Sequence, residues 1–314
     1  MKKLVSSTLL ISSLSIVGFA QQDAQFSQFM FNKQTINPGY VGTNKALCAT
    51  AVYRTQWVSF PGAPKTFLFS GDAFLLPAHG GVGLTVWQDQ LGFDKSFSAK
   101  AAYSFHVPLG AGTLGVGLEM GMLQKTLSNQ WVATQRWQDD PAIPNGVSTI
   151  TYDVGFGAFY TTNQLYFGIS STHLPESSLK KGSIPSFEFK LARHYYIMAG
   201  YDFQLGSAEW ELKPCILVKS DAASTQMDMN LSVMYDKMVW AGLSYRLTDA
   251  VAPMLGYQHD LGGNKGILKI GYSYDVTTSE LKNYSNNSHE IMVNYCFKIK
   301  PKNKTQSHQN VRFL

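Results

Sequence analysis

Apolar and polar residues alternate with a period of two along most of this chain. In residues 94–109, Phe97, Tyr103 and Phe105 share one phase, whereas serine, lysine and histidine occupy much of the other. Such alternation predicts β-strands with two different faces, since successive side chains of a strand point in opposite directions. The pattern indicates about fourteen strands, near residues 47–57, 64–74, 80–91, 93–107, 112–124, 148–161, 164–172, 187–203, 207–219, 226–235, 237–246, 250–258, 266–278 and 289–299.

The residues on the polar phase distinguish two kinds of all-β protein. A soluble sandwich would present lysine, glutamate and threonine to water, but this phase is mostly glycine, serine, asparagine and aspartate. That composition is typical of a crowded barrel interior, and Tyr53, Trp57 and Tyr152 lie near strand ends, as in interfacial aromatic girdles. Charged residues make up only 15% of the chain, against about 25% in soluble domains. We therefore expect an all-β fold, a transmembrane antiparallel β-barrel of about 14 strands.

The two ends of the chain differ from its body. Lys2, Lys3 and the apolar stretch that follows them resemble a cleaved export signal. We expect four parts: a signal peptide in residues 1–20, a short N-terminal periplasmic or plug-like segment in 21–46, the outer-membrane barrel in 47–299 and a basic C-terminal tail in 300–314. An even number of strands would leave both termini in the periplasm. Without the tail and the signal lysines the chain is about neutral, which argues against nucleic acid as a partner.

The segment before the first strand is rich in aromatic residues. Three phenylalanines need burial, and Asn37-Pro38-Gly39 predicts a turn before the chain enters the barrel. A short segment that places its aromatic side chains in or under the barrel mouth meets both requirements, and a peptide that docks onto a partner is the alternative. The candidate lumen or partner-binding residues here are Phe26, Phe29, Phe31, Asn37, Pro38 and Tyr40.

Charged residues on the polar phase are further candidates. Facing the lumen, they would pair with one another in an interior network, or they would grip an inserted polypeptide. These residues are Arg54, Asp72, Glu119, Asp153 and Lys269.

The first hairpin adds Gln56, Trp57 and Lys65. They either constrain the fold of the turn or contact the N-terminal segment.

Catalytic chemistry has little support in the sequence. It holds no nucleophile elbow, no H-E-x-x-H, no C-x-x-C and no phosphate-binding loop. We therefore expect no enzyme activity, no cofactor and no metal site.

Two of the three cysteines lie where closure of a barrel would bring them together. Cys48 opens the first expected strand, and Cys296 lies near the end of the last. A disulfide across this seam is compatible with the oxidising periplasm, and two free thiols are the alternative.

Several motifs resemble those of the PorP/SprF family of outer-membrane proteins. They are "QFSQFMFN", "ATAVYRTQWVSFPGAPKTFLFSGDAFL" and "GVGLTVWQDQLGF" near the start, and "SHEIMVNYCF" near the end. The resemblance is densest over residues 24–95 and 285–297. It implies a non-enzymatic component of the type IX secretion and gliding machinery of Bacteroidota, set in outer-membrane lipid. The implied partners are a secreted, adhesin-like surface protein, bound through its C-terminus, or the periplasmic machinery. An outer-membrane diffusion channel or transporter of hydrophobic solutes is the alternative function.

Overall fold

The structure, a computed structural model, describes residues 23–128, 147–180, 188–206, 209–262, 265–283 and 285–297. Fourteen antiparallel strands form its barrel. They are β1 (Leu47–Thr55), β2 (Lys65–Leu75), β3 (Gly80–Leu91), β4 (Asp94–Leu109), β5 (Gly112–Leu127), β6 (Val147–Thr161), β7 (Leu165–Thr172), β10 (His194–Tyr201), β12 (Trp210–Ser220), β13 (Thr225–Tyr235), β14 (Val239–Arg246), β15 (Ala250–Asp260), β16 (Ile267–Thr277) and β17 (Ser288–Phe297).

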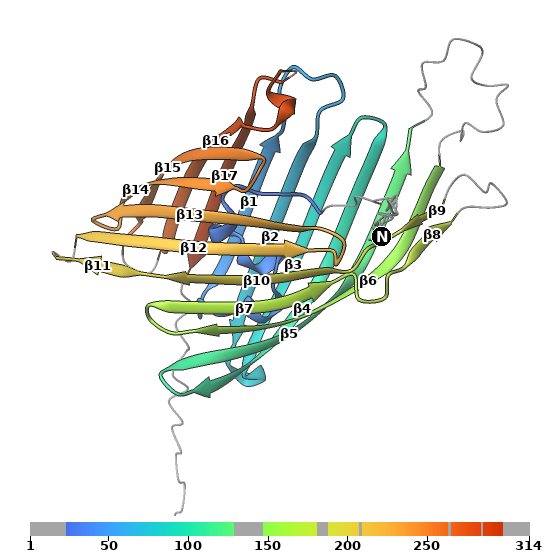
Figure 1. The fold of residues 1–314 in the computed structure, drawn as a ribbon. Coiled ribbons are helices and arrows are strands. Elements are labelled where there is room, and N and C mark those ends of the chain that lie inside the picture. Colours follow the sequence, from blue (N-terminus) through green and yellow to red (C-terminus); the bar gives the residue numbers. More distant parts are fainter. Residues whose placement is uncertain are drawn as a thin grey trace, which may run out of the picture.

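The sheet closes because β1 pairs with β17 and β10 pairs with β12 (Figure 1). The short β11 (Phe203–Leu205) continues β10 along β12, and β8 (Ser178–Lys180) pairs with β9 (Glu188–Lys190) in a separate ribbon. Among the described residues, no helix is long and apolar enough to cross a membrane.

The predicted fold is confirmed, and each barrel strand overlaps one expected segment. The strand expected near residues 187–203 is wrong at its start, because β10 begins only at His194. Leu191 is buried beside Leu123, and Arg193 donates a hydrogen bond to the carbonyl oxygen of Leu174. This stretch therefore packs against the loop that follows β7 before the chain joins the sheet.

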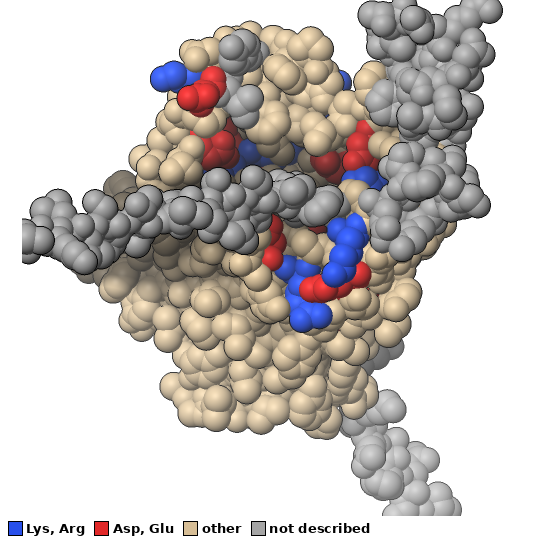
Figure 2. Space-filling view, turned by 45° about the vertical axis from the view of Figure 1, so that its right-hand side comes forward, with Lys and Arg blue, Asp and Glu red and all other residues tan. Residues whose placement is uncertain are grey.

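The barrel wall carries apolar side chains outside and polar side chains inside. Tyr53, Phe67 and Phe156 are 47%, 49% and 47% exposed, whereas Thr50 and Ser70, on the opposite phase, are buried. Figure 2 shows a broad surface without charged residues, and acidic and basic side chains gathered around one hollow. So large an exposed apolar surface is unfavourable in water, and an outward-facing apolar band is what a lipid-embedded barrel requires.

A disulfide fastens the seam of the barrel. β1 and β17 pair without a break from Leu47 opposite Phe297 to Thr55 opposite His289. In this register Cys48 lies directly opposite Cys296, their Cα atoms are 4.0 Å apart and their sulfur atoms are bonded. The bond joins the first strand to the last across a sequence separation of 248 residues.

Residues 23–46 lie inside the barrel and form what we call the lumen segment. It contains three short 3₁₀ turns, η1 (Phe29–Phe31), η2 (Lys33–Thr35) and η3 (Pro38–Tyr40). Phe29 is buried among side chains of β6, β10 and β12. The ring centroids of Phe31 and of Trp240 on β14 lie 4.7 Å apart. Burial of these rings offsets the loss of chain entropy when the segment orders inside the barrel.

The lumen segment passes from one end of the barrel toward the other. Asp23 contacts His173, which directly follows β7, at the end that also holds Thr55; we call this the Thr55 end. The segment leads into β1 at the opposite end, the Leu47 end, where Phe297 closes β17. The first and last described residues therefore lie toward opposite ends of the barrel.

The disulfide leads to a prediction about thiol counts. The chain has three cysteines, and Cys215 is the free one. Alkylation of the unreduced, denatured protein should label one thiol, and alkylation after reduction should label three, as read from intact mass. The Cys48→Ser variant should label two thiols without reduction and lose about 2–5 kcal/mol of stability. Three reactive thiols before reduction would contradict the seam bond.

Candidate functional site

Arg54 of β1 holds the start of the lumen segment through two buried carboxylates. Its guanidinium donates to Asp275 Oδ2 at 2.7 Å and to Glu290 Oε2 at 2.9 Å. The Ser27 hydroxyl accepts from Arg54 at 2.9 Å and donates to Asp275 at 2.6 Å. The backbone N–H groups of Ser27 and Gln28 donate to Glu290 at 2.8 and 2.9 Å. One charged cluster thus stabilises both the barrel seam and the segment.

A second charged cluster lies on the other side of the lumen. Lys100 of β4 lies 3.0 Å from Glu119 Oε1 on β5 and 2.8 Å from Asp153 Oδ2 on β6. His173 continues it, with Nδ1 2.9 Å from Asp153 and Nε2 2.9 Å from Asp23 Oδ1. Burial alone would lower the pKa of His173, but the two carboxylates raise it to about 9. Burial would likewise raise the pKa of Asp23, but His173 holds it well below its usual value.

The turn at Asn37 locks the middle of the segment to the wall. Asn37 Oδ1 accepts the N–H of Gly39, and Nδ2 donates to the carbonyl oxygens of Ala158 and Ile169 at 2.9 and 3.0 Å. The wall must be glycine here, since a Cβ on Gly157 would lie 2.3 Å from Asn37 Oδ1. Glycines on the polar phase thus leave room for the backbone of the segment.

Other hydrogen bonds reach the remaining sides of the barrel. Gln34 Nε2 donates to the carbonyl oxygens of Gly71 and Leu84, and the N–H of Gly42 donates to Asp72 Oδ2 at 2.8 Å. Wall serines also donate to segment carbonyls: Ser104 to Gly39, Ser170 to Ile36 and Ser244 to Ser27. The segment is therefore bonded to strands all around the lumen.

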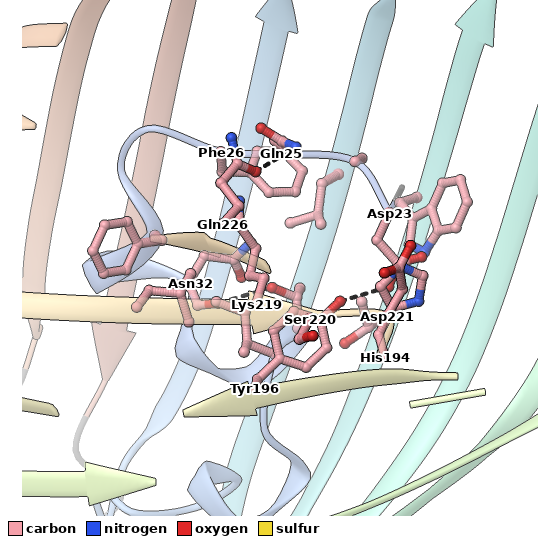
Figure 3. Close-up of a pocket in the computed structure, with 18 of the residues that line it drawn as sticks. Asp23, Gln25, Phe26, Asn32, His194, Tyr196, Lys219, Ser220, Asp221 and Gln226 are labelled. Carbon is pink, nitrogen blue, oxygen red and sulfur yellow. Dashed lines mark hydrogen bonds between the residues drawn. The ribbon is translucent and has the colours of Figure 1, made fainter. Parts of the chain in front are cut away.

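Two cavities flank the lumen segment. The Thr55-end cavity, of about 90 Å³, is lined by Asp23, Tyr196, Lys219 and Asp221, among others (Figure 3). The Leu47-end cavity is larger, about 760 Å³, and its lining mixes apolar, polar and charged residues, with four lysines (Lys33, Lys45, Lys213 and Lys269) and two aspartates (Asp202 and Asp260). It has the size of a small-ligand or peptide-anchor site.

Two lysines give the Leu47-end cavity a positive lining. Lys33 Nζ lies 3.8 Å from the ring centroid of Tyr166, and Lys269 Nζ lies 5.9 Å from that of Phe31. Within the described part of the chain, these ammonium groups lie over aromatic rings rather than beside a carboxylate. Both lysines are half-buried and line the cavity.

The structure brings most of the predicted site residues together. The six candidates of the N-terminal stretch, Phe26, Phe29, Phe31, Asn37, Pro38 and Tyr40, all belong to the lumen segment, and Arg54, Asp72, Glu119 and Asp153 are buried.

The hairpin residues Gln56, Trp57 and Lys65 lie elsewhere. The N–H of Gln56 donates to the Pro64 carbonyl oxygen, the N–H of Trp57 donates to Ser288 Oγ, and Lys65 is exposed. For Gln56 and Trp57 these bonds correspond to the turn-constraint alternative.

The charged residues do not pair with one another as expected. Arg54 instead pairs with Glu290, directly opposite on β17, and Glu119 and Asp153 share Lys100. Sequence reasoning missed the partners Lys100, Asp275 and Glu290, although all three lie on the polar phase of their strands. It also missed His173 and His194, because loop and strand-end positions carry no periodic signal.

Comparisons with known proteins identify the family of this chain. A family model for the type IX secretion system membrane protein PorP/SprF matches residues 18–295. The Acinetobacter baumannii outer membrane protein Omp33 is similar in structure, with 7% identity and a TM-score of 0.43, over 81% of this chain and 99% of that one. A mutant of the TodX monoaromatic hydrocarbon channel shows 10% identity and a TM-score of 0.44, over 81% and 89%. The beta domain of the Bordetella autotransporter BrkA shows 11% identity and a TM-score of 0.38, over 81% and 99%. A search of curated proteins finds no match.

The Arg54 cluster generates a stability prediction. Replacing Arg54 by Gln leaves Asp275 and Glu290 buried without their counter-charge, which should lower the free energy of unfolding by about 3–5 kcal/mol. The control Lys95→Gln changes an exposed lysine and should shift stability by less than about 0.5 kcal/mol. Urea unfolding in detergent, followed by tryptophan fluorescence, measures both. Equal stability of the two variants would show that the cluster contributes nothing.

Proposed function

Since the chain belongs to the PorP/SprF family of type IX secretion system membrane proteins, we propose that it is a non-enzymatic partner-binding barrel rather than an open channel. Its partner is a secreted surface protein, held by an acidic segment or its C-terminal carboxylate, or a periplasmic component of the machinery. The proposal depends on one observation, the occupation of the lumen by residues 23–46.

The lumen segment leaves little room for a diffusion pathway. A channel for solutes needs a continuous water-filled lumen, but here Ser27, Asn37 and Gly42 are bonded to opposite sides of the wall. Displacing the segment would expose the buried carboxylates of Asp275 and Glu290 and leave them without part of their hydrogen bonds, which is costly.

The lengths of the connections support an orientation. Outer-membrane barrels have short turns on the periplasmic side and longer loops outside. Connections at the Leu47 end are short, such as residues 110–111 and 162–164, whereas the Thr55 end carries residues 56–64, 128–146 and 278–287. We therefore assign the Leu47 end to the periplasm, so that Phe297 lies on that side and Asp23 lies inside the lumen, toward the outer face.

The Leu47-end cavity is the proposed partner site. It would be reached from the periplasm, where a secreted protein and the machinery are both present. Its lysines Lys33 and Lys269 are half-buried and have no carboxylate partner within the described part of the chain, so a carboxylate from a partner would supply a counter-charge. An anionic polypeptide end therefore fits this cavity better than a neutral hydrophobic solute does.

Affinity isolation and conductance together test the function. The protein purified from detergent-solubilised outer membrane should retain its partner and show no steady single-channel conductance in a lipid bilayer. The double variant Lys33→Gln/Lys269→Gln should weaken partner binding by about tenfold or more, the loss expected for a charge-assisted hydrogen bond. The matched control Lys65→Gln, on the exposed first hairpin, should bind as the unchanged protein does. A partner-free protein with an open conducting pore would instead favour the diffusion channel.

A further inference from the structure

Three potential metal ligands converge at the Thr55 end of the lumen. Asp23 comes from the lumen segment, His173 from the loop after β7, and His194 from the first position of β10. Each offers one ligand atom, and these atoms lie within 4.8 Å of one another. Figure 3 shows Asp23 and His194 next to each other at one edge of the cavity. Atoms bound to one tetrahedral zinc ion lie roughly 3.3 Å apart. Asp23 Oδ1 and His173 Nε2 lie 2.9 Å apart, so zinc would move this pair slightly apart and draw in His194 from within 4.8 Å.

Each of these side chains is already oriented by a second contact. Asp23 Oδ2 accepts a hydrogen bond from the Tyr196 hydroxyl at 2.8 Å, so Oδ1, which lies 2.9 Å from His173 Nε2, is the oxygen that faces the two histidines. His173 Nδ1 lies 2.9 Å from Asp153 Oδ2, and His194 Nδ1 lies 3.0 Å from the carbonyl oxygen of Ala192. Metal-binding histidines in proteins usually direct their other ring nitrogen to a carboxylate or a backbone carbonyl in this way. The three proposed ligand side chains are thus each held in place by a neighbouring protein group.

We propose that Asp23, His173 and His194 bind a Zn²⁺ ion that fastens the lumen segment to the barrel wall. Two imidazoles and one carboxylate form a donor set that zinc favours, with water as a fourth ligand. Mg²⁺ and Ca²⁺ prefer sites made of oxygen atoms and fit this set poorly.

The charge around the cluster supports a divalent cation. Glu119 and Asp153 both contact Lys100, and Asp153 and Asp23 both contact His173. Three carboxylates and one ammonium group thus take part in these described contacts, and a divalent ion on Asp23 would add positive charge in a buried place where unpaired negative charge is costly.

The position of the site gives it a structural role. Asp23 begins the described part of the lumen segment, whereas His173 and His194 flank the excursion between β7 and β10. A zinc ion would therefore join the start of the lumen segment to the wall at the Thr55 end, whereas the disulfide lies at the Leu47 end. The inference is independent of the partner-binding proposal, because it concerns the opposite cavity.

Zinc titration of the full chain tests the proposal. The protein, purified in detergent with a tag that lacks histidine, should bind one Zn²⁺ with a dissociation constant in the micromolar range or lower by calorimetry, and should bind Mg²⁺ at least about 100-fold more weakly. Co²⁺ in place of zinc should give the visible absorption bands of a four-coordinate site. Asp23→Asn and His194→Ala should each weaken zinc binding by at least about tenfold.

The control variant is His259→Ala, which removes an exposed histidine elsewhere on the barrel and should leave zinc affinity unchanged. Heat-modifiable migration on gels checks that each variant is folded; Asp23 lies outside the barrel strands, so Asp23→Asn decides the matter even where a histidine variant fails to fold. The proposal is wrong if the unchanged protein binds no zinc in the micromolar range, or if Asp23→Asn binds it as tightly as the unchanged protein does.

Discussion

The structure depends on the need to satisfy polar groups enclosed by a lipid-facing wall. Strand alternation sends every second side chain into the lumen, where water is scarce and an unpaired charge or hydrogen-bonding group is costly. Arg54, Asp275 and Glu290 meet this need partly among themselves and partly through Ser27 and Gln28 of the lumen segment. The barrel and residues 23–46 are therefore one hydrogen-bonded unit, in which the wall provides partners for the segment and the segment for the wall.

The fold and most of the residues that face the lumen could be predicted from the sequence, but the contacts between those residues could not. Period-two alternation identifies which face a residue occupies, so the inward position of Arg54, Asp72, Glu119 and Asp153 could be predicted. Alternation does not determine register around a closed sheet, and a contact such as Ser27 with Glu290, 263 positions apart, depends on that register. The disulfide is instructive because Cys48 and Cys296 become neighbours through closure alone. The interruption before β10, by contrast, depends on how Leu191 and Arg193 pack, which leaves no periodic trace in the sequence.

Family membership and the filled lumen both favour the proposed partner-binding function over a diffusion channel. In the function that we propose, a barrel whose interior is filled by its own chain holds a partner at its mouth and does not conduct solutes. The basic Leu47-end cavity provides a place for such contact, while the Asp23, His173 and His194 cluster lies at the other end of the same segment. The lumen segment contributes Asp23 to one cavity and Lys33 to the other, so the order of the segment determines the shape of both.

Hydrogen–deuterium exchange of the lumen segment is the most direct measurement of this account. The N–H groups of Ser27, Gln28 and Gly42 donate to wall carboxylates, so peptides that cover residues 23–46 should exchange as slowly as those of β1 and β17 in the detergent-solubilised protein. Exchange of these peptides at the rate of an unstructured chain, while the strands remain protected, would mean that the lumen is empty and that the central claim is wrong.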